Sequence, residues 1–198
     1  MRYLKWAIRI IFVLFIIGLL HYTLPQQDIA RITDTYEKRI DFGANSLFWS
    51  GGDSGSAANP TNRDVFFIQA FRRNEKPMIY RNEDTGFGWP LFFKFDTANL
   101  QAEASDMISK KSEAETQWVV VRHYGWRNEY LSIYPNALSI RPIEDPNVRL
   151  IPWGNIIRLT LLAALFWGLW VRWVRFREAR IDPRLERVDD WMNDKLGR

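Results

Sequence analysis

The stretch IPWGNIIRLTLLAALFWGLWVRWVRF, from Ile151 to Phe176, decides the fold of this chain of 198 residues. It is apolar along its length, with aromatic side chains near its ends and arginines just beyond it. About 20 apolar residues are enough to cross a hydrocarbon core of roughly 30 Å. The one charge between Trp153 and Val171 is Arg158, which lies close enough to one end to reach the lipid headgroups. The stretch therefore predicts a membrane-spanning helix.

A second run of the same kind, WAIRIIFVLFIIGLLHYTL, extends from Trp6 to Leu24. Its basic start would also suit a cleaved signal peptide, but the residues from His21 to Pro25 contain no pair of small residues typical of a cleavage site. We interpret the run as an uncleaved anchor. The predicted organisation is then a short N-terminus at 1–5, a span at 6–24, a domain at 25–150, a second span at 151–172 and a basic tail at 173–198.

The charges are distributed unevenly along the chain. Residues 1–24 and 151–198 each carry a net charge of +3, whereas residues 25–150 carry −2. Positive charge is retained on the cytoplasmic side of membrane proteins, so this pattern predicts cytoplasmic termini and a domain on the other side. The high pI of 9.4 thus belongs to the membrane flanks and argues against nucleic-acid binding. The absence of cysteine excludes disulfides and thiolate metal sites.

The segment between the two runs predicts one α+β domain. Alternating or β-branched residues indicate strands at 28–42, 64–71, 77–82, 91–95, 117–123, 130–134 and 137–142. Asp96 is a good N-cap for a helix from Thr97 to about Lys110. Residues 50–62 read as a loop, and Tyr134 to Asn136 as a tight turn. We expect a small antiparallel β-sheet or partly open barrel with one covering helix, flanked by two transmembrane helices.

The tail after the second span predicts a short amphipathic helix. Asp182 precedes Pro183, a sequence typical of an N-cap followed by the first helical residue. Apolar residues then recur at nearly helical spacing, so the helix beginning near Arg184 would suit the inner membrane surface, with arginines meeting anionic lipid. A solvated tail that folds only on contact is the alternative.

Residues 122–129, RHYGWRNE, form the densest cluster of polar and aromatic side chains. A histidine such as His123 can act as a base, and Arg127 could clamp a carboxylate or phosphate. Ser132 and Ser139 could face the same way, but no nucleophile-elbow motif supports a serine-histidine-aspartate arrangement. The alternative is a strand end followed by a loop with aromatic residues at its rim.

Residues 81–90, RNEDTGFGWP, form the second cluster. Glu83 and Asp84 are adjacent and would point to opposite faces of a strand, which argues against a shared acid-base role. The chain has two histidines and no ligand spacing typical of zinc, so we predict no metal, no cofactor and no catalytic set. The predicted binding residues are Trp89, Asp84, His123, Tyr124, Trp126 and Arg127.

Several long strings resemble an uncharacterised bacterial two-pass inner-membrane family, domain of unknown function 1523. They are HYTLPQ from 21, RNEDTGFGWP from 81, FKFDTANLQAEASD from 93, HYGWRNEYLSIYPNALSI from 123, RLIPW from 149 and RIDPRLERVDDW from 180. The resemblance covers nearly the whole chain. It implies a bacterial inner membrane with the domain in the periplasm, and it implies no activity or catalytic residue.

These observations favour a membrane-anchored periplasmic binding or accessory protein for an inner-membrane or envelope complex. Its partners would be the lipid bilayer and a membrane or periplasmic protein, met by the surface at 87–89 and 124–128. The sequence favours a role without catalysis, and it leaves the oligomeric state open. One alternative is a periplasmic hydrolase or transferase acting on lipid-linked or cell-wall material through the region of His123 and Arg127. Another is a lipid-sensing module acting through the tail.

Overall fold

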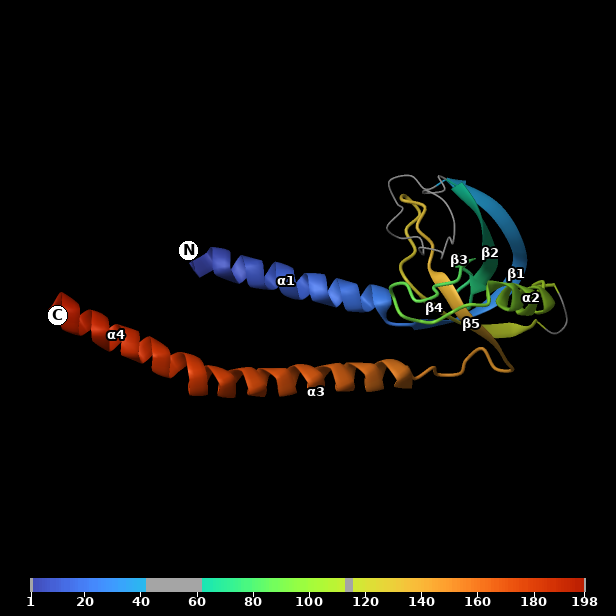
Figure 1. The fold of residues 1–198 in the computed structure, drawn as a ribbon. Coiled ribbons are helices and arrows are strands. Elements are labelled where there is room, and N and C mark those ends of the chain that lie inside the picture. Colours follow the sequence, from blue (N-terminus) through green and yellow to red (C-terminus); the bar gives the residue numbers. More distant parts are fainter. Residues whose placement is uncertain (1, 42–61, 113–115, 198) are drawn as a thin grey trace. The chain divides into compact units, whose positions relative to one another are not determined.

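The computed structural model describes residues 2–41, 62–112 and 116–197, which form two compact units, Met1–Ile151 and Pro152–Arg198. The predicted loop at 50–62 lies almost wholly outside the described residues. The first unit contains helix α1 and a five-stranded barrel with one further helix, and the second unit is helical (Figure 1). The α+β prediction is therefore confirmed.

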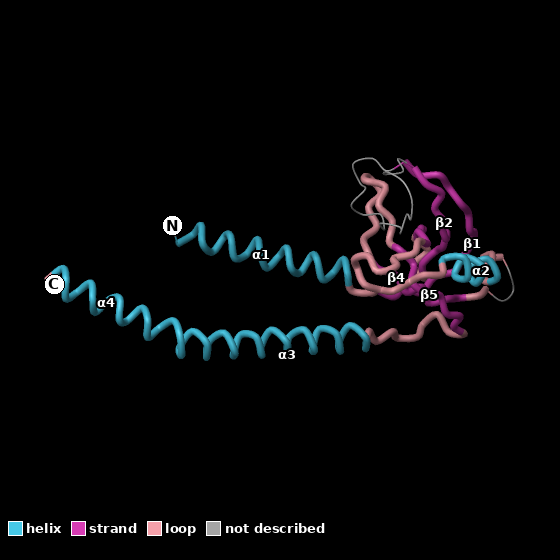
Figure 2. The backbone as a smooth tube through the Cα atoms, viewed as in Figure 1, coloured by secondary structure: helices cyan, strands magenta, loops and turns pink. Residues whose placement is uncertain are grey.

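Five strands close into a barrel in the order β1-β2-β3-β5-β4. Figure 2 shows the strands in magenta, with loops in pink and helices in cyan. Their bounds are Gln26–Asp41 for β1, Asn62–Arg72 for β2, Pro77–Asn82 for β3, Trp118–Tyr124 for β4 and Asn136–Ile143 for β5. The long strand β1 pairs with β4 through residues 26–30 and with β2 through residues 30–41, so one strand builds two sides of the wall.

The barrel is closed rather than partly open, and not all of its pairs are antiparallel. Strands β3 and β5 pair parallel through Arg81 and Asn136. Parallel neighbours need a long crossover, and here it contains α2 and β4. Asn136 is fully buried and completes the closure of the barrel. Its side-chain amide accepts a hydrogen bond from Glu83 N and donates one to Glu83 O, both at 3.0 Å, and it also donates to the Tyr124 hydroxyl at 3.2 Å. We call this junction of β3 and β5 the seam.

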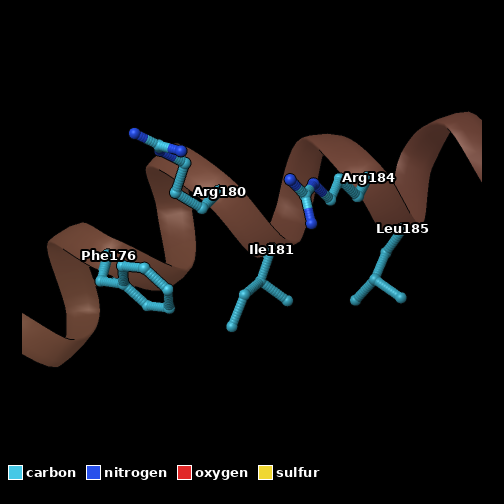
Figure 3. A pocket seen from close by; sticks show the side chains of 5 residues that line it. All are labelled: Phe176, Arg180, Ile181, Arg184 and Leu185. Atoms are coloured by element: carbon cyan, nitrogen blue, oxygen red, sulfur yellow. The ribbon is translucent and has the colours of Figure 1, made fainter.

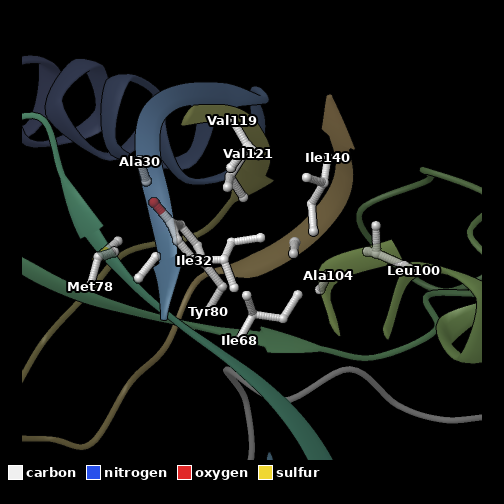
Figure 4. Packing of buried hydrophobic residues seen from close by; sticks show 12 residues of the cluster. Ala30, Ile32, Ile68, Met78, Tyr80, Leu100, Ala104, Val119, Val121 and Ile140 are labelled. Atoms are coloured by element: carbon white, nitrogen blue, oxygen red, sulfur yellow. The ribbon is translucent and has the colours of Figure 1, made fainter. Parts of the chain in front are cut away.

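Helix α2, Thr97–Asp106, covers the barrel as predicted for the one helix. The Asp96 side chain accepts a hydrogen bond from Asn99 N at 3.0 Å, which confirms the expected N-cap. Leu100 and Ala104 pack into the core with residues from all five strands (Figure 4). The helix ends four residues earlier than expected because the chain turns away, and Ser109 N donates to the carbonyl of Ile32 on β1 at 3.0 Å.

Two predicted strands are loops. Residues 91–95, LFFKF, are rich in phenylalanine, but Leu91, Phe93 and Phe95 are more than half exposed. The backbone of Lys94 bonds to Thr85 and Gly86 instead of to a strand. Residues 130–134 contribute only an isolated bridge between Asn128 and Ile133. The expected turn at 134–136 is also wrong, because β5 already begins at Asn136 and the Pro135 carbonyl accepts a hydrogen bond from Arg81 N.

Two helices are long and apolar enough to cross a membrane, judged by length and composition. The first lies within α1, Arg2–Thr23, and covers Tyr3–Thr23; the second covers Trp153–Lys195. None of the residues in their apolar windows is buried. The second helix comprises α3, Trp153–Phe176, a π-helical segment η2, Arg177–Ile181, and α4, Asp182–Leu196.

Asp182 is not the predicted N-cap, because the helix runs through it without a break and its carboxylate lies 3.5 Å from Arg177 Nε. At this junction Phe176, Ile181 and Leu185 point to one side and Arg180 to the other (Figure 3). The shallow hollow between them, about 340 Å³ and also lined by Arg184, has walls from a single helix. It lacks the enclosure typical of a ligand site.

Replacing Asn136 by alanine should destabilise the barrel, because it leaves two backbone groups of Glu83 and one hydroxyl buried without their partner. We expect a loss of about 3 kcal/mol in the free energy of unfolding, or roughly a 10 °C lower Tm. Thermal unfolding of the full chain in detergent, followed by tryptophan fluorescence, measures this. Asn99→Ala, an exposed position on α2, is the matched control, and an equal effect in both variants would contradict the role of the seam.

Candidate functional site

Asp28, near the start of β1, is contacted by side chains from three other strands. Its Oδ2 atom accepts a hydrogen bond from the Tyr80 hydroxyl of β3 at 2.8 Å. It also lies 3.1 Å from His123 Nε2 of β4 and 3.0 Å from Arg72 Nε of β2. Because an ionised carboxylate can only accept, His123 carries its hydrogen on Nε2. Four of the five strands therefore meet at one carboxylate, and we call these four residues the Asp28 cluster.

The alternation of the strands places the Asp28 cluster inside the barrel. Successive strand residues point to opposite faces, so Asp28 shares a face with Ala30, and His123 with Val121, both core residues. Tyr80 is itself part of the core, and Figure 4 shows its hydroxyl directed toward β1. His123 is 2% exposed, whereas the side chains of Asp28 and Arg72 are 21% and 36% exposed. The carboxylate is held from inside the barrel and is accessible from outside.

The electrostatics of the cluster disfavour proton exchange. Burial alone would raise the pKa of the Asp28 carboxyl, but hydrogen bonds from His123 and Tyr80 and the charge of Arg72 outweigh it, so this pKa lies below its ordinary value. Burial and the nearby Asp28 charge raise the pKa of Tyr80 well above its usual 10. The carboxylate is thus a weak base and the phenol a weak acid.

A catalytic triad is not assembled around His123. Its second ring nitrogen, Nδ1, is buried and has no hydrogen-bond partner within residues 2–41, 62–112 and 116–197. A serine nucleophile would have to occupy that position. The same described residues contain no group of three histidine or acidic side chains that could hold a metal ion. The arrangement is suited to holding a fixed negative charge among donors.

A second buried polar group adjoins the seam. Arg81 and Glu83 form an ion pair at 2.9 Å with both side chains buried. Lys94 donates hydrogen bonds to Asn82 Oδ1 and, at 2.9 Å, to the carbonyl of Ala137. Burial lowers the pKa of Lys94 to about 8, against the opposing effect of the neighbouring carboxylates. These contacts fix the segment after β3 to the barrel wall.

The last turn of α1 docks on the barrel through aromatic residues. The Tyr22 ring packs edge-on against Tyr124 and Trp126, with centroids 6.2 and 5.3 Å apart, and Trp126 Nε1 donates to His21 Nδ1 at 2.9 Å. Gly125 N donates to the Tyr22 carbonyl at 2.9 Å. Glycine is favoured here because φ is +92°, a backbone conformation that other residues rarely adopt.

Residues 86–95, which we call the aromatic loop, expose large apolar side chains beside this docking site. Phe87, Trp89, Leu91, Phe93 and Phe95 are each more than half exposed. The loop is nevertheless held at its base, because Thr85 N and Gly86 N donate to the Lys94 carbonyl at 3.1 and 3.0 Å. Phe92 packs against Tyr124, with centroids 4.8 Å apart, which joins the loop to the end of α1.

The structure brings together only part of the predicted binding set. Tyr124 and Trp126 meet at Tyr22, but Tyr124 is 1% exposed and so cannot touch a partner directly. Trp89 lies exposed on the aromatic loop, whereas Asp84 is held by the Thr97 hydroxyl at 2.5 Å.

His123 and Arg127 have separate surroundings. His123 belongs to the Asp28 cluster, whereas Arg127 stacks on the Tyr134 ring at 4.6 Å and donates to the carbonyls of Asn128 and Ile133. The contacts of Arg127 stabilise its own loop. An enzyme site that used His123 as a base and Arg127 to clamp an anion would need the two side chains to converge. Their contacts among the described residues do not bring them together.

Sequence reasoning missed Asp28, Arg72 and Tyr80. One signal was available for Asp28, a charged residue in register with Ala30 and Ile32 on the inward face of an alternating strand. A charge at such a position needs buried partners. Tyr80 and Arg72 gave no comparable signal, because their meeting at Asp28 depends on how three strands pair.

Comparison with known proteins shows the family. The model of a family described as "Protein of unknown function (DUF1523)" matches residues 1–177. The chain belongs to this family. A Haemophilus influenzae relative described as an uncharacterized protein is 34% identical over 168 residues, which are 83% of this chain and 89% of that protein. No solved structure matches. The resemblance seen in the sequence is thus confirmed for the DUF1523 family, whose matched region includes α1, the barrel and α3.

Replacing Asp28 by asparagine should destabilise this DUF1523 protein, because Tyr80, His123 and Arg72 lose a charged acceptor. We expect the free energy of unfolding at pH 7 to fall by about 2–3 kcal/mol. Thermal unfolding in detergent measures the change, and Asp34→Asn, at an exposed position on the same strand, is the control.

The pH dependence of this difference follows from the pKa of Asp28. Because this pKa in the folded protein lies below the ordinary 3.8, the stabilisation is present above pH 3.8 and is lost as the pH falls through the folded-state value. The wild type and the Asp28→Asn variant should therefore converge in Tm only below about pH 4. A difference that is constant down to pH 3 would contradict this electrostatic account.

Proposed function

We propose that this protein is a membrane-anchored periplasmic accessory protein that binds a partner in an inner-membrane or envelope complex. The observation that carries the proposal is the aromatic loop. Five large apolar side chains are exposed on a loop whose base is fixed by backbone hydrogen bonds and by the half-buried Lys94. Exposed aromatic clusters of this kind are typical of interaction sites rather than of free surface.

The position of the aromatic loop favours a partner in the same membrane. Phe92 of the loop contacts Tyr124, and Tyr124 contacts Tyr22 in the last turn of α1. If α1 spans the bilayer, the exposed side chains lie close to the level where it leaves the hydrocarbon. A membrane protein that projects slightly from the same bilayer would meet the loop there, and Trp89 and Phe93 would serve as its anchors.

The anchoring at two points follows from the two apolar helices and the charges at the chain ends. Both ends carry a net charge of +3, and residues 25–150 carry −2, which supports cytoplasmic termini and a periplasmic barrel. Two attachments would restrict how the barrel tilts, so the aromatic loop would face its partner with little orientational entropy to lose. The separate contacts of His123 and Arg127 offer no support for a hydrolase or transferase.

The absence of cysteine allows a direct test of the topology. We expect Tyr130→Cys, at a fully exposed barrel position, to react with a membrane-impermeant maleimide in intact spheroplasts. Val188→Cys, at an exposed position in α4, should react only after the membrane is permeabilised. Reaction of both positions, or of Val188→Cys alone, before permeabilisation would contradict the proposed orientation.

Photo-crosslinking tests the partner surface. A benzophenone amino acid at position 89 or 93 should give one discrete adduct with a membrane protein in living cells, since both side chains are exposed on the aromatic loop. The same group at position 130, also exposed but outside the aromatic loop, is the control. Adducts that are equally diverse at all three positions, or absent at 89 and 93, would overturn the proposed surface.

A further inference from the structure

An open cleft of about 570 Å³ lies in the barrel unit, outside the aromatic loop. Three segments form it: residues 27–29 at the start of β1, residues 72–74 at the β2–β3 turn, and residues 147–150 after β5. The Arg73 backbone N–H donates to the Ile29 carbonyl at 3.1 Å, and the Arg73 side chain donates to the Pro146 carbonyl at 3.3 Å. The three segments are thus bonded to one another, so the cleft has a defined shape.

Cationic side chains dominate the cleft. Arg72, Arg73 and Arg149 line it together with one acidic residue, Asp28. The Asp28 carboxylate is already occupied by Tyr80, His123 and Arg72, so it does not neutralise the other two arginines. Arg149 is exposed, and no hydrogen bond or ion pair joins its side chain to another residue of the described ranges. The cleft therefore presents a surplus of positive charge with guanidinium groups open to a ligand.

The remaining lining narrows the chemistry of that ligand. Asn74 and Asn147 contribute amide groups, which can donate to oxygen atoms, while Ile29, Val148 and Leu150 give the cleft an apolar side. Guanidinium groups bind phosphate oxygens in bidentate fashion, with greater strength than neutral donors. A phosphate group that carries an apolar chain therefore matches both the cationic and the apolar residues of the cleft.

The chain connections also place the cleft near the candidate spans. Gln27 follows the end of α1 at Thr23 by four residues, which reach at most about 14 Å. Leu150 precedes the start of α3 at Trp153 by three residues. If these helices cross a bilayer, both lining segments lie at the depth of the lipid phosphates.

We propose that this cleft binds a phosphate group, and that an anionic phospholipid headgroup supplies it. Arg73 and Arg149 hold the phosphate oxygens, Arg72 is fixed by Asp28 at the back of the cleft, and Ile29, Val148 and Leu150 contact the glycerol and upper acyl chain. The phosphate site stands on the residues of the barrel alone. Only the choice of a lipid as its source depends on the proposed membrane placement.

The test compares ligands on the purified full chain in a non-ionic detergent, with bound lipid detected by native mass spectrometry. The probes are short-chain phosphatidylglycerol, phosphatidylcholine and inorganic phosphate. We expect phosphatidylglycerol to bind, and the Arg73→Gln, Arg149→Gln double variant to bind it about tenfold more weakly or worse, since charge-assisted hydrogen bonds are lost. Arg141→Gln with Lys110→Gln, two exposed cations of the barrel unit outside the cleft, is the charge-matched control and should bind like the wild type.

Each outcome decides the proposal. Binding of inorganic phosphate with the same loss in the double variant, and no binding of phosphatidylglycerol, would keep the phosphate site and overturn the lipid source. Equal binding of phosphatidylglycerol by the double variant and the control would overturn the site. An unchanged Tm verifies that the double variant is folded, and Asn147→Asp, which adds a negative charge at the cleft, is a second variant expected to weaken binding. Topology labelling and crosslinking at position 89 succeed or fail independently of these results.

Discussion

The closure of the barrel at the seam is the constraint on which the rest of the structure depends. The other neighbouring strands are joined by several residue pairs, whereas β3 and β5 share the pair of Arg81 and Asn136, with a backbone hydrogen bond from Arg81 N to the Pro135 carbonyl. Side-chain bonds from Asn136 to both backbone groups of Glu83 replace the missing ladder. Without them the barrel would have two open edges, and open edges are sites of unwanted pairing. A single buried amide thus completes a wall that is otherwise built by backbone hydrogen bonds.

The seam also connects the barrel to α1. Asn136 donates to the Tyr124 hydroxyl, and the Tyr124 ring lies between Tyr22 of α1 and Phe92 of the aromatic loop. Barrel closure, the docking of α1 and the position of the aromatic loop therefore share the same few residues. Loosening any one of them would release the other two.

The sequence was sufficient where local rules decide the structure and insufficient where long-range pairing does. The apolar helices, the strand at 77–82 and the Asp96 cap follow from periodicity and capping, which act over a few residues. The parallel pairing of β3 and β5 involves residues about 50 positions apart, and no local pattern encodes it. Residues 91–95 misled the prediction because their phenylalanines, which favour strands, lie on a surface loop that exposes every second side chain. The convergence on Asp28 was likewise invisible, since it requires the register of four strands.

The aromatic loop and the cleft differ in chemistry but are built in the same way. Each consists of exposed side chains on a base fixed by partly buried polar groups: Lys94 holds the aromatic loop, and Asp28 holds Arg72 in the cleft. Fixing a surface before binding reduces the entropy lost on association. It also explains why charged groups are retained inside a small barrel, where apolar residues would give similar or greater stability. The charges of Asp28 and Lys94 therefore hold Arg72 and the aromatic loop in place, and keeping them partly inside a small barrel lowers the stability of the core.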